Sequence, residues 1–261
     1  MPHRDLLERV AQHVRDYVGL TREAVSLPPF VAYFHPQYAE TWFNFAVPAG
    51  RIVPEADLGA SLSKLRAAFM LRGRPLRIEF VGELWPDLPN ALERSGMKRD
   101  SVQTILVCRP GELRPRRRPG IDVRLLNADD EDAVLEQWLR VQHESFGTPA
   151  GFGGTAADEI AYARSKLRTD VWRGAVAIEN GAFVGTGTTL LANGAGELAA
   201  IGTLPAHRRR GVASALTTFL VEDFYARGGE LAWLGAGDAA ARQAYEGIGF
   251  QVIGTQVVFS M

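Results

Sequence analysis

The sequence is poor in several features that whole classes of protein require. Cys108 is the only cysteine among the 261 residues, which excludes an intrachain disulfide and a thiolate metal cluster. No apolar run has the length of a membrane span, and the charged start from Met1 to Arg9 is unlike a signal peptide. The formal net charge is only −1, so bulk attraction to nucleic acid or to anionic lipid is not expected. We therefore expect a cytoplasmic protein with no nucleic-acid partner and no membrane partner.

Motifs of several other enzyme classes are also missing. None of the histidines has the spacing of a metal ligand, so we expect no metal. The absence of a G-x-S-x-G nucleophile elbow leaves an α/β-hydrolase without support. The run 235–240 has the G-x-G-x-x-A pattern of dinucleotide sites, but the residues that follow it, 241–261, are too few to complete such a unit.

What is present is the composition of an ordinary globular protein, with 46% hydrophobic and 23% charged residues. The length suits one large domain or two smaller ones. Proline and arginine accumulate between Arg109 and Gly120, which predicts a linker and a division into domains 1–118 and 119–261. The basic run of this linker could bind nucleic acid or lipid, but the balanced net charge favours a solvated connector.

The second half predicts alternating strands and helices. Apolar periodicity indicates strands at 121–125, 172–179, 183–192, 198–204, 231–234 and 251–259, and helices at about 129–146, 156–168, 211–227 and 238–247. The pair Asn180-Gly181 predicts a tight hairpin turn. Four glycines between Phe146 and Thr155 predict a mobile loop between the first two helices.

The most informative segment is a basic loop. The strand predicted at 198–204 leads through this loop into a helix that begins near Gly211. Free backbone N–H groups and the positive end of a helix then meet at one point, which suits a phosphate. Gly211 lets the backbone approach an anion closely, and Arg208, Arg209 and Arg210 add positive charge. The alternative is an exposed basic turn before an ordinary amphipathic helix.

Two motifs in this half resemble those of a known superfamily. Arg208, Gly211 and Ala213 match the R-x-x-G-x-A form of an acyl-CoA pyrophosphate loop, and 241–250 matches an A-x-x-x-Y-x-x-x-G-F signature. Together with the order of elements, they make residues 121–261 resemble the GNAT superfamily of acyl-CoA-dependent N-acyltransferases. The resemblance implies an α/β (α+β) fold with a mixed, mostly antiparallel central sheet flanked by helices. It also implies acetyl-CoA as the cofactor.

The resemblance also implies roles for particular residues. The main chain of the strand 198–204 would bind the pantetheine arm and the acyl oxygen, because in this superfamily the strand separates from its neighbour. Tyr245 would be the general acid that protonates the departing thiolate; it could also be merely a half-buried aromatic of its helix. The implied cofactor-binding residues are Ile201, Thr203, Arg208, Arg209, Arg210, Gly211, Val212, Ala213 and Ser214.

A general base is harder to identify. Glu197 opens the predicted central strand, near where members of the superfamily often place a carboxylate that acts through water; the alternative is a solvated residue at a strand end. His143 and Glu144, on the first helix of this half, have a similarly weak claim. His207, beside the basic loop, would assist phosphate binding or face solvent.

The first half contains a weaker copy of the end of the second. The segment 71–73 corresponds to 226–228, and 91–97 corresponds to 244–250, at offsets of 155 and 153 residues. We infer two GNAT-like units in tandem, although a generic helix–strand–helix–strand is an alternative. The first offset places 53–58 opposite 208–213, where Glu55 and Asp57 would repel a pyrophosphate, so we expect an inactive N-terminal unit.

These observations predict an acetyl-CoA-dependent N-acetyltransferase that transfers the acetyl group to a primary amine by direct attack in a ternary complex. The acceptor is expected to be a small molecule, and the chain a monomer or a homodimer. Two alternatives stay open: a non-catalytic acyl-CoA-binding or sensor module, and an acyltransferase that uses a longer acyl-CoA. Only catalysis predicts release of free thiol when amines are offered with acetyl-CoA.

Overall fold

The computed structural model describes residues 3–50, 55–148 and 154–261, without the side chains of 55–57. The chain forms two compact units. The first unit comprises Met1–Ile105, Gly235–Asp238 and Ile253–Met261, and the second comprises Leu106–Leu234 and Ala239–Val252. The linker therefore belongs to the second unit and the last strand ends in the first. The division of the sequence into 1–118 and 119–261 stays a prediction.

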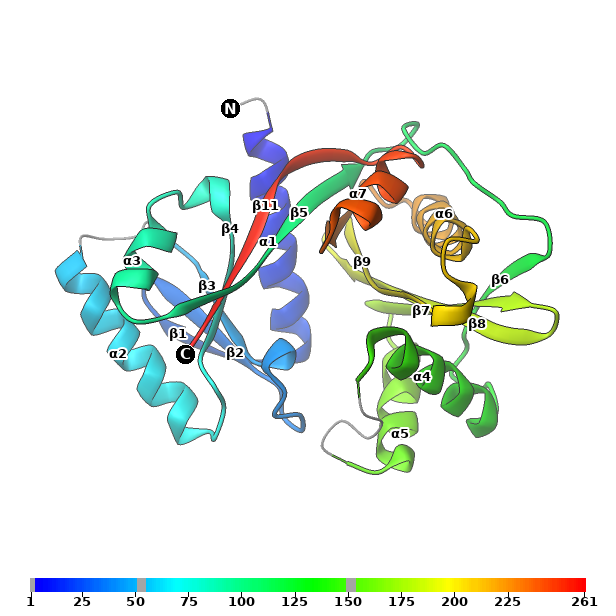
Figure 1. Cartoon of the computed structure of the whole chain (residues 1–261). Helices are drawn as coiled ribbons and strands as arrows, with labels where there is room; N and C mark the ends of the chain where they lie inside the picture. The colour runs from blue at the N-terminus through cyan, green and yellow to red at the C-terminus, as the bar shows by residue number, and fades with distance from the viewer. Residues whose placement is uncertain (1–2, 51–54, 149–153) are drawn as a thin grey trace. The chain divides into compact units, whose positions relative to one another are not determined.

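The first unit has an antiparallel meander followed by a helix and a parallel strand (Figure 1). Its hydrogen-bonded strand order is β1-β2-β3-β4-β11, and β4 pairs with β11 antiparallel. Short 3₁₀ turns occupy Thr41–Phe43 and Gly82–Leu84. The elements are α1 (Arg4–Thr21), β1 (Glu23–Leu27), β2 (Phe30–Phe34), β3 (Phe45–Pro48), α2 (Glu55–Leu71), β4 (Arg77–Val81), α3 (Leu88–Arg94) and the start of β5 (Lys98–Cys108).

The second unit repeats this plan with a longer meander. Its strand order is β10-β9-β8-β7-β6, in which only β10 and β9 run parallel. A 3₁₀ turn at Pro205–His207 lies between β9 and α6. The elements are β6 (Ile121–Leu125), α4 (Asp132–Phe146), α5 (Ala156–Leu167), β7 (Trp172–Glu179), β8 (Ala182–Ala192), β9 (Ala195–Thr203), α6 (Val212–Ala226), β10 (Leu231–Ala236), α7 (Ala239–Glu246) and β11 (Gln251–Ser260).

The predicted fold class, α/β with mostly antiparallel strand pairing and helices in two similar units, is confirmed. The turn Asn180-Gly181 joins β7 to β8 with φ angles of 52° and 78°, as its sequence predicts. The strand predicted at 198–204 begins three residues earlier, at Ala195. A second tight turn, Asn193-Gly194, also with positive φ at both residues, sets this start.

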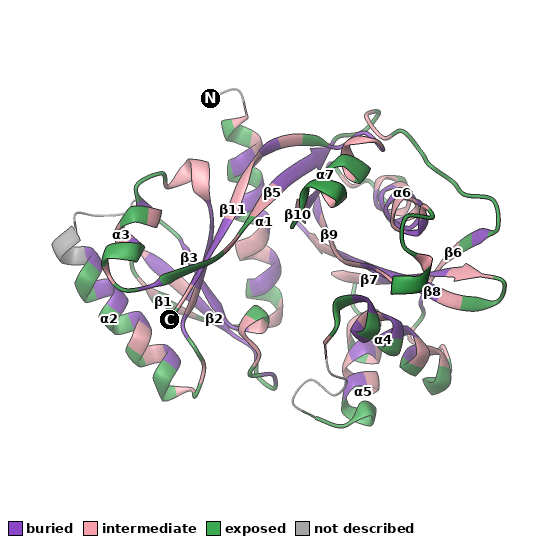
Figure 2. Cartoon of the chain, viewed as in Figure 1, coloured by how far each residue is buried: buried purple, intermediate pink, exposed green. Residues whose placement is uncertain are grey.

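Glycine lets both helices approach the sheet of the second unit closely. A Cβ on Gly185 of β8 would lie 2.6 Å from Val212 of α6, and one on Gly202 of β9 would lie 2.7 Å from Ser145 of α4. Because Gly185 pairs with Thr203, Gly185 and Gly202 face opposite sides of the sheet, so α6 and α4 cover opposite faces. Figure 2 shows the buried residues concentrated on the strands and on one side of the helices.

The two units end their helices in the same way. Gly73 after α2 and Gly228 after α6 have φ angles of 62° and 83°, and each N–H bonds a carbonyl three residues back. Gly96 after α3 and Gly249 after α7 repeat the pattern, with φ angles of 86° and 106°. The correspondences found in the sequence therefore mark equivalent helix ends. Residues 53 and 54, and the side chains of Glu55 and Asp57, lie outside the described residues.

Candidate functional site

Strands β9 and β10 separate part-way along their length. They pair in parallel only from Ala195 opposite Leu231 to Glu197 opposite Trp233. Beyond Glu197, β9 continues to Thr203 with register partners on β8 alone. Within the described residues, Leu198–Thr203 therefore have no strand partner on one side, and main-chain groups along that edge can bond an extended ligand.

A β-bulge lies in the middle of this open edge. Thr186 pairs with Gly202 and Thr188 with Ala199, so Ala200 and Ile201 together face a single residue of β8. Ala200 has a φ of 51°, a left-handed conformation that alanine rarely adopts. The hydroxyls of Thr188 and Thr186 donate to the carbonyls of Ala199 and Ala200, at 2.9 and 3.2 Å. The bulge changes the direction of the main chain at the point where a ligand would bond the strand. No residue type in this part of the sequence predicts the bulge.

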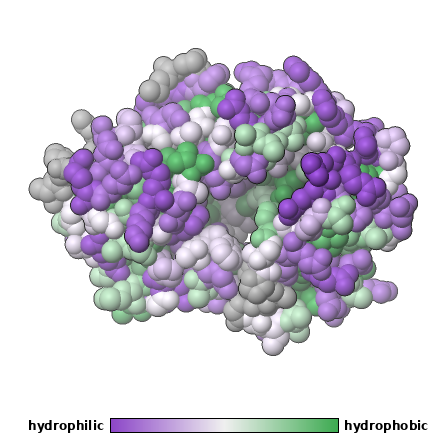
Figure 3. All heavy atoms as spheres, in the orientation of Figure 1, coloured by the Kyte–Doolittle hydropathy of each residue, from purple (hydrophilic) through white to green (hydrophobic). Residues whose placement is uncertain are grey.

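The basic loop connects β9 to α6 as predicted. Gly211 caps the helix with a φ of 86°, and Val212 begins the helix with a buried side chain. Ala213 and Ser214 follow in the first turn and are half-buried. Small residues thus surround the free N–H groups at the positive end of α6, an arrangement that suits a phosphate. On the face drawn in Figure 3, hydrophilic residues gather over the region that α6 occupies in Figure 1.

Arg208 bonds the protein itself. Its Nη2 donates to the main-chain oxygen of Ser145 at 2.9 Å, and its Nε donates to that of Thr203 at 3.3 Å. The guanidinium therefore joins the end of α4 to the end of β9. A cation on the last carbonyls of a helix also favours the helix dipole. This side chain shapes the loop, whatever further contact it makes with a ligand.

Arg210 and His207 share one carboxylate. Oε1 of Glu179 lies 3.0 Å from Nη2 of Arg210, and Oε2 lies 2.7 Å from Nδ1 of His207. The Glu179 side chain is mostly buried at the end of β7, with 13% of its surface exposed. Sequence reasoning missed this carboxylate. Arg209, with a φ of 59°, is exposed and makes no ion pair or side-chain hydrogen bond within the described residues.

The catalytic candidates lie on two elements. Glu197 is the last β9 residue paired with β10, at the point where the strands separate. Tyr245 lies on α7, half-buried, and its ring centroid is 6.1 Å from that of Phe250. Ile201 and Thr203 share β9 with Glu197 and are half-buried. The convergence of Glu197 and Tyr245 on one reacting group stays a prediction.

A pocket of about 770 Å³ opens between α4 and α5. His143 and Glu144, the weaker base candidates, both line it. His143 is buried and bonded on both sides: its Nδ1 lies 3.1 Å from Oγ1 of Thr148, and its Nε2 lies 3.1 Å from Oε2 of Glu159. The charged lining consists of Glu136, Glu144 and Glu159 together with Arg140, so carboxylates outnumber cations and the pocket would favour an ammonium group.

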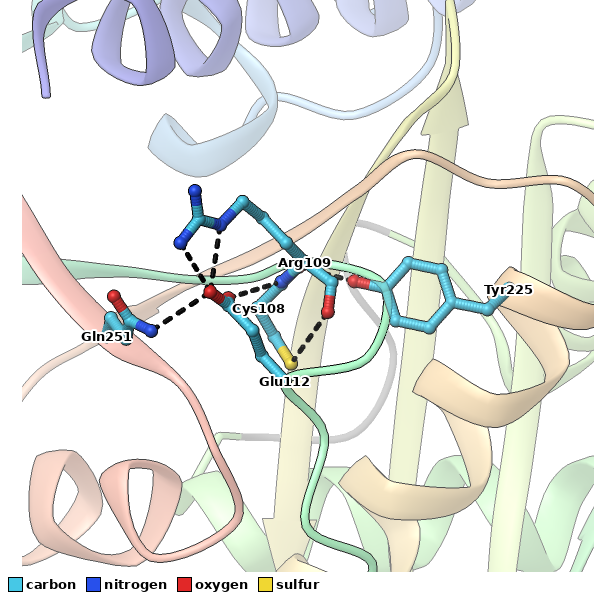
Figure 4. A network of polar contacts seen from close by, with 5 residues as sticks. All are labelled: Cys108, Arg109, Glu112, Tyr225 and Gln251. Carbon is cyan, nitrogen blue, oxygen red and sulfur yellow. Dashed lines mark hydrogen bonds and ion pairs between the residues drawn. The ribbon is translucent and has the colours of Figure 1, made fainter.

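Cys108 is buried at the end of β5, in a network with α6 and β11 (Figure 4). Tyr225 donates its hydroxyl proton to the Cys108 carbonyl, and the thiol faces the carbonyl of Arg109. Burial, and then the nearby Glu112 carboxylate, raise the pKa of the Cys108 thiol to about 11. Such a thiol is protonated at neutral pH and is a poor nucleophile.

The described residues contain no group of three or more His, Cys, Asp or Glu side chains that could hold a metal ion. In the same part of the chain, no helix is long and apolar enough to cross a membrane.

Comparisons with known proteins agree with this geometry. Residues 177–259 match the family model of FR47-like proteins. A GCN5-related N-acetyltransferase from Kribbella flavida superposes with a TM-score of 0.80 at 25% identity, over 97% of this chain and 95% of that chain. A GCN5-related N-acetyltransferase from Sphaerobacter thermophilus gives 0.69 at 18% identity, over 97% and 84%. A tandem GNAT protein from the clavulanic acid biosynthesis pathway gives 0.61 at 12%, over 89% and 78%. A search of curated proteins found no match.

The separated strands, the glycine-capped basic loop and these similarities define an acyltransferase fold. The FR47-like match and the fold shared with N-acetyltransferases support membership of the GNAT superfamily, whose acetyltransferases use acetyl-CoA.

Proposed function

We propose that the chain is an acetyl-CoA-dependent N-acetyltransferase that transfers an acetyl group to a primary amine by direct attack in a ternary complex. The observation that carries this proposal is the separation of β9 from β10 at Glu197, with the open edge leading directly into the R-x-x-G-x-A loop. An extended acyl-CoA needs a strand edge that bonds its amide-containing arm, followed by a helix N-terminus that binds its diphosphate.

The residues of the open edge fit such a ligand. Oγ1 of Thr203, near the end of the edge, is buried and has no hydrogen-bond partner. Oγ of Ser145, on the turn of α4 that packs on Gly202, is also buried and without a partner. Buried hydroxyls without partners are rare because each forfeits its hydration. A ligand with amide groups would supply the missing bonds.

Acetyl-CoA would supply the activated acyl group, and the chain would supply positioning and proton transfer. The main chain around Ile201 and Thr203 would hold the arm and the acyl oxygen. The loop Arg208–Ser214 would hold the diphosphate, chiefly through its main chain and Arg209. Glu197 would take a proton from the attacking amine through water, and the Tyr245 hydroxyl would give one to the departing sulfur. The buried, protonated Cys108 favours this direct route over one through a cysteine intermediate.

The pocket between α4 and α5 is our candidate entry for the amine. Its carboxylates would attract a protonated small-molecule amine, and the end of α4 that borders it also contacts Gly202 of the open edge. We further propose that the N-terminal unit is inactive, because its sequence has two carboxylates in place of the arginine loop. A free buried thiol suits a reducing, cytoplasmic location.

A thiol-release assay tests the proposal. The purified chain would be incubated with acetyl-CoA and a panel of primary amines, with an amine-free blank and parallel reactions with longer acyl-CoA donors. Release of free CoA thiol that depends on an amine and is fastest with acetyl-CoA would support it. Binding of acetyl-CoA without amine-dependent thiol release would instead indicate a non-catalytic module, and faster release with a longer donor would contradict the acetyl preference.

A further inference from the structure

The basic linker is held against the second unit and is not a freely solvated connector. At its start, Tyr225 of α6 bonds the Cys108 carbonyl (Figure 4). Glu112 accepts from the Arg109 side chain at 2.9 Å and from Gln251 of β11 at 3.0 Å. Two elements that are far apart in sequence, α6 and β11, therefore hold the start of the linker.

The middle of the linker continues along α6 toward its N-terminus. The N–H of Arg114 bonds the Ile248 carbonyl at 2.9 Å, next to Gly249. A Cβ on Gly249 would lie 2.1 Å from the carbonyl oxygen of Glu112, so only glycine leaves room for the linker there. The N–H of Arg116 then bonds Oγ1 of Thr218 on α6 at 3.1 Å.

The next two arginines differ in their partners. Arg117 forms an ion pair with Glu222 of α6, with Nη2 at 2.9 Å and 3.1 Å from the two carboxylate oxygens. Arg118 lies beside Gly211, where a Cβ on the glycine would be 3.6 Å from Cδ and 3.9 Å from Cγ of the arginine. The Arg118 guanidinium is exposed and has no partner within the described part of the chain.

The charges around the start of α6 therefore fall into two groups. Arg208 bonds two main-chain carbonyls and Arg210 pairs with Glu179, so both are already engaged by the protein. Arg209 and Arg118 have no such partners within the described residues. Arg118 lies against Gly211, and Arg209 belongs to the same loop as this glycine. Two arginines without partners at the positive end of a helix suit an anion with more than one phosphoryl group.

We propose that Arg118, delivered by the linker, binds the diphosphate of CoA together with Arg209 and the main chain at Gly211. This assignment rests on the proposed function and adds a ligand contact from outside the R-x-x-G-x-A loop. Because the aliphatic part of Arg118 packs beside Gly211, where the main chain would bind the diphosphate, we assign Arg118 to the diphosphate and not to the 3′-phosphate.

Calorimetric titration of three variants with CoA and with dephospho-CoA tests this role. The variants are Arg118→Ala, Arg118→Lys and, as the matched control, Arg117→Ala, which removes a neighbouring arginine already paired with Glu222. Thermal melts verify that each variant is folded. We expect Arg118→Ala to weaken the binding of both ligands by about tenfold, which is the effect of losing one charge-assisted hydrogen bond. The variant should also show a smaller salt dependence of binding. Arg118→Lys should recover part of the loss, and Arg117→Ala should stay within about twofold of the wild type.

The outcomes separate the two proposals. A loss confined to CoA would overturn the diphosphate assignment and indicate the 3′-phosphate. Equal affinities for wild type and Arg118→Ala, or an equal loss in Arg117→Ala, would overturn the role of Arg118 while leaving CoA binding intact. Failure of the wild type to bind either ligand would overturn both this inference and the proposed function.

Discussion

Oε1 of Glu179 lies 3.0 Å from Nη2 of Arg210, so the last arginine of the basic loop is already neutralised by the protein. The three consecutive arginines of the loop look equivalent in the sequence, but they have different partners in the structure. Arg208 holds the end of α4, Arg210 is paired with Glu179, and Arg209 is exposed without a partner.

The first prediction contrasts Arg209 with Arg210. Arg209→Ala should weaken CoA binding by about tenfold, because it removes a cation that has no other partner. Arg210→Ala should change the affinity by no more than about threefold, because its charge is balanced by Glu179. Calorimetry on the two variants measures both effects. A larger loss in Arg210→Ala than in Arg209→Ala would show that Glu179 does not withdraw Arg210 from the ligand.

The second prediction concerns the proton for the leaving group. Tyr245→Phe should lower turnover with acetyl-CoA by at least about a hundredfold, since positioned general acids contribute on that scale. Its affinity for CoA should stay within about twofold of the wild type, because the ring and its contact with Phe250 remain. Thiol-release kinetics and calorimetry give the two numbers, with Tyr162→Phe on α5 as the matched control. Unchanged turnover in Tyr245→Phe would remove Tyr245 from the mechanism.

The third prediction tests the bulge at Ala200. Glycine adopts a φ of 51° without strain. In Ala200→Gly, the relief of backbone strain in the folded state offsets the larger conformational entropy that glycine gives the unfolded state. The free energy of unfolding should therefore change by less than about 1 kcal/mol. Ala200→Val should lose at least about 2 kcal/mol, because a β-branched residue is strongly disfavoured there.

Ala199→Gly is the matched control for the bulge, since this neighbour does not have a positive φ. It should destabilise by about 0.5–1 kcal/mol, as glycine does in an ordinary strand. Denaturant unfolding of the three variants measures these differences. If Ala200→Gly is as harmful as Ala200→Val, the left-handed conformation at Ala200 is wrong.

The fourth prediction follows from the buried thiol. Burial and the Glu112 carboxylate raise the pKa of Cys108 to about 11, so the folded protein should not react with Ellman's reagent at pH 8, whereas the denatured chain should yield one thiol. Because the folded state holds this proton more tightly, its contribution to stability is complete below the unfolded pKa and is lost as pH rises toward 11.

As pH rises from 8 toward the Cys108 pKa of about 11, the free energy of unfolding should therefore fall less in Cys108→Ala than in the wild type. Rapid labelling of Cys108 in the native protein would contradict its burial and would also complicate any thiol-release assay.

The local elements of the second unit were the easiest to predict from the sequence. The strand 172–179 and the turn Asn180-Gly181 were predicted as they stand, because alternation and an Asn-Gly pair act over a few residues. The bulge at Ala200 carries no such signal, since alanine is not a residue that turns favour. The partners of Arg210 and Arg117, Glu179 and Glu222, lie 31 and 105 residues away in the sequence, and only tertiary packing brings each pair together.

The linker gave the largest difference between expectation and structure. Its prolines and arginines indicated a solvated connector, yet its main chain is bonded to Ile248 and Thr218. Gly249 belongs to the signature that carries the resemblance, and it also leaves room for the linker to pass. The composition of a segment indicates whether its side chains are buried in a hydrophobic core. It does not indicate whether the main-chain groups of that segment form hydrogen bonds with the rest of the protein.

We propose that the tandem chain carries one acyl-CoA site, at the open edge of β9 and the loop that enters α6. Titration of the intact chain with acetyl-CoA in a calorimeter tests this most directly. We predict one saturable site per chain. Two sites per chain would show that the N-terminal unit also binds the ligand, and the absence of any binding would contradict the claim itself.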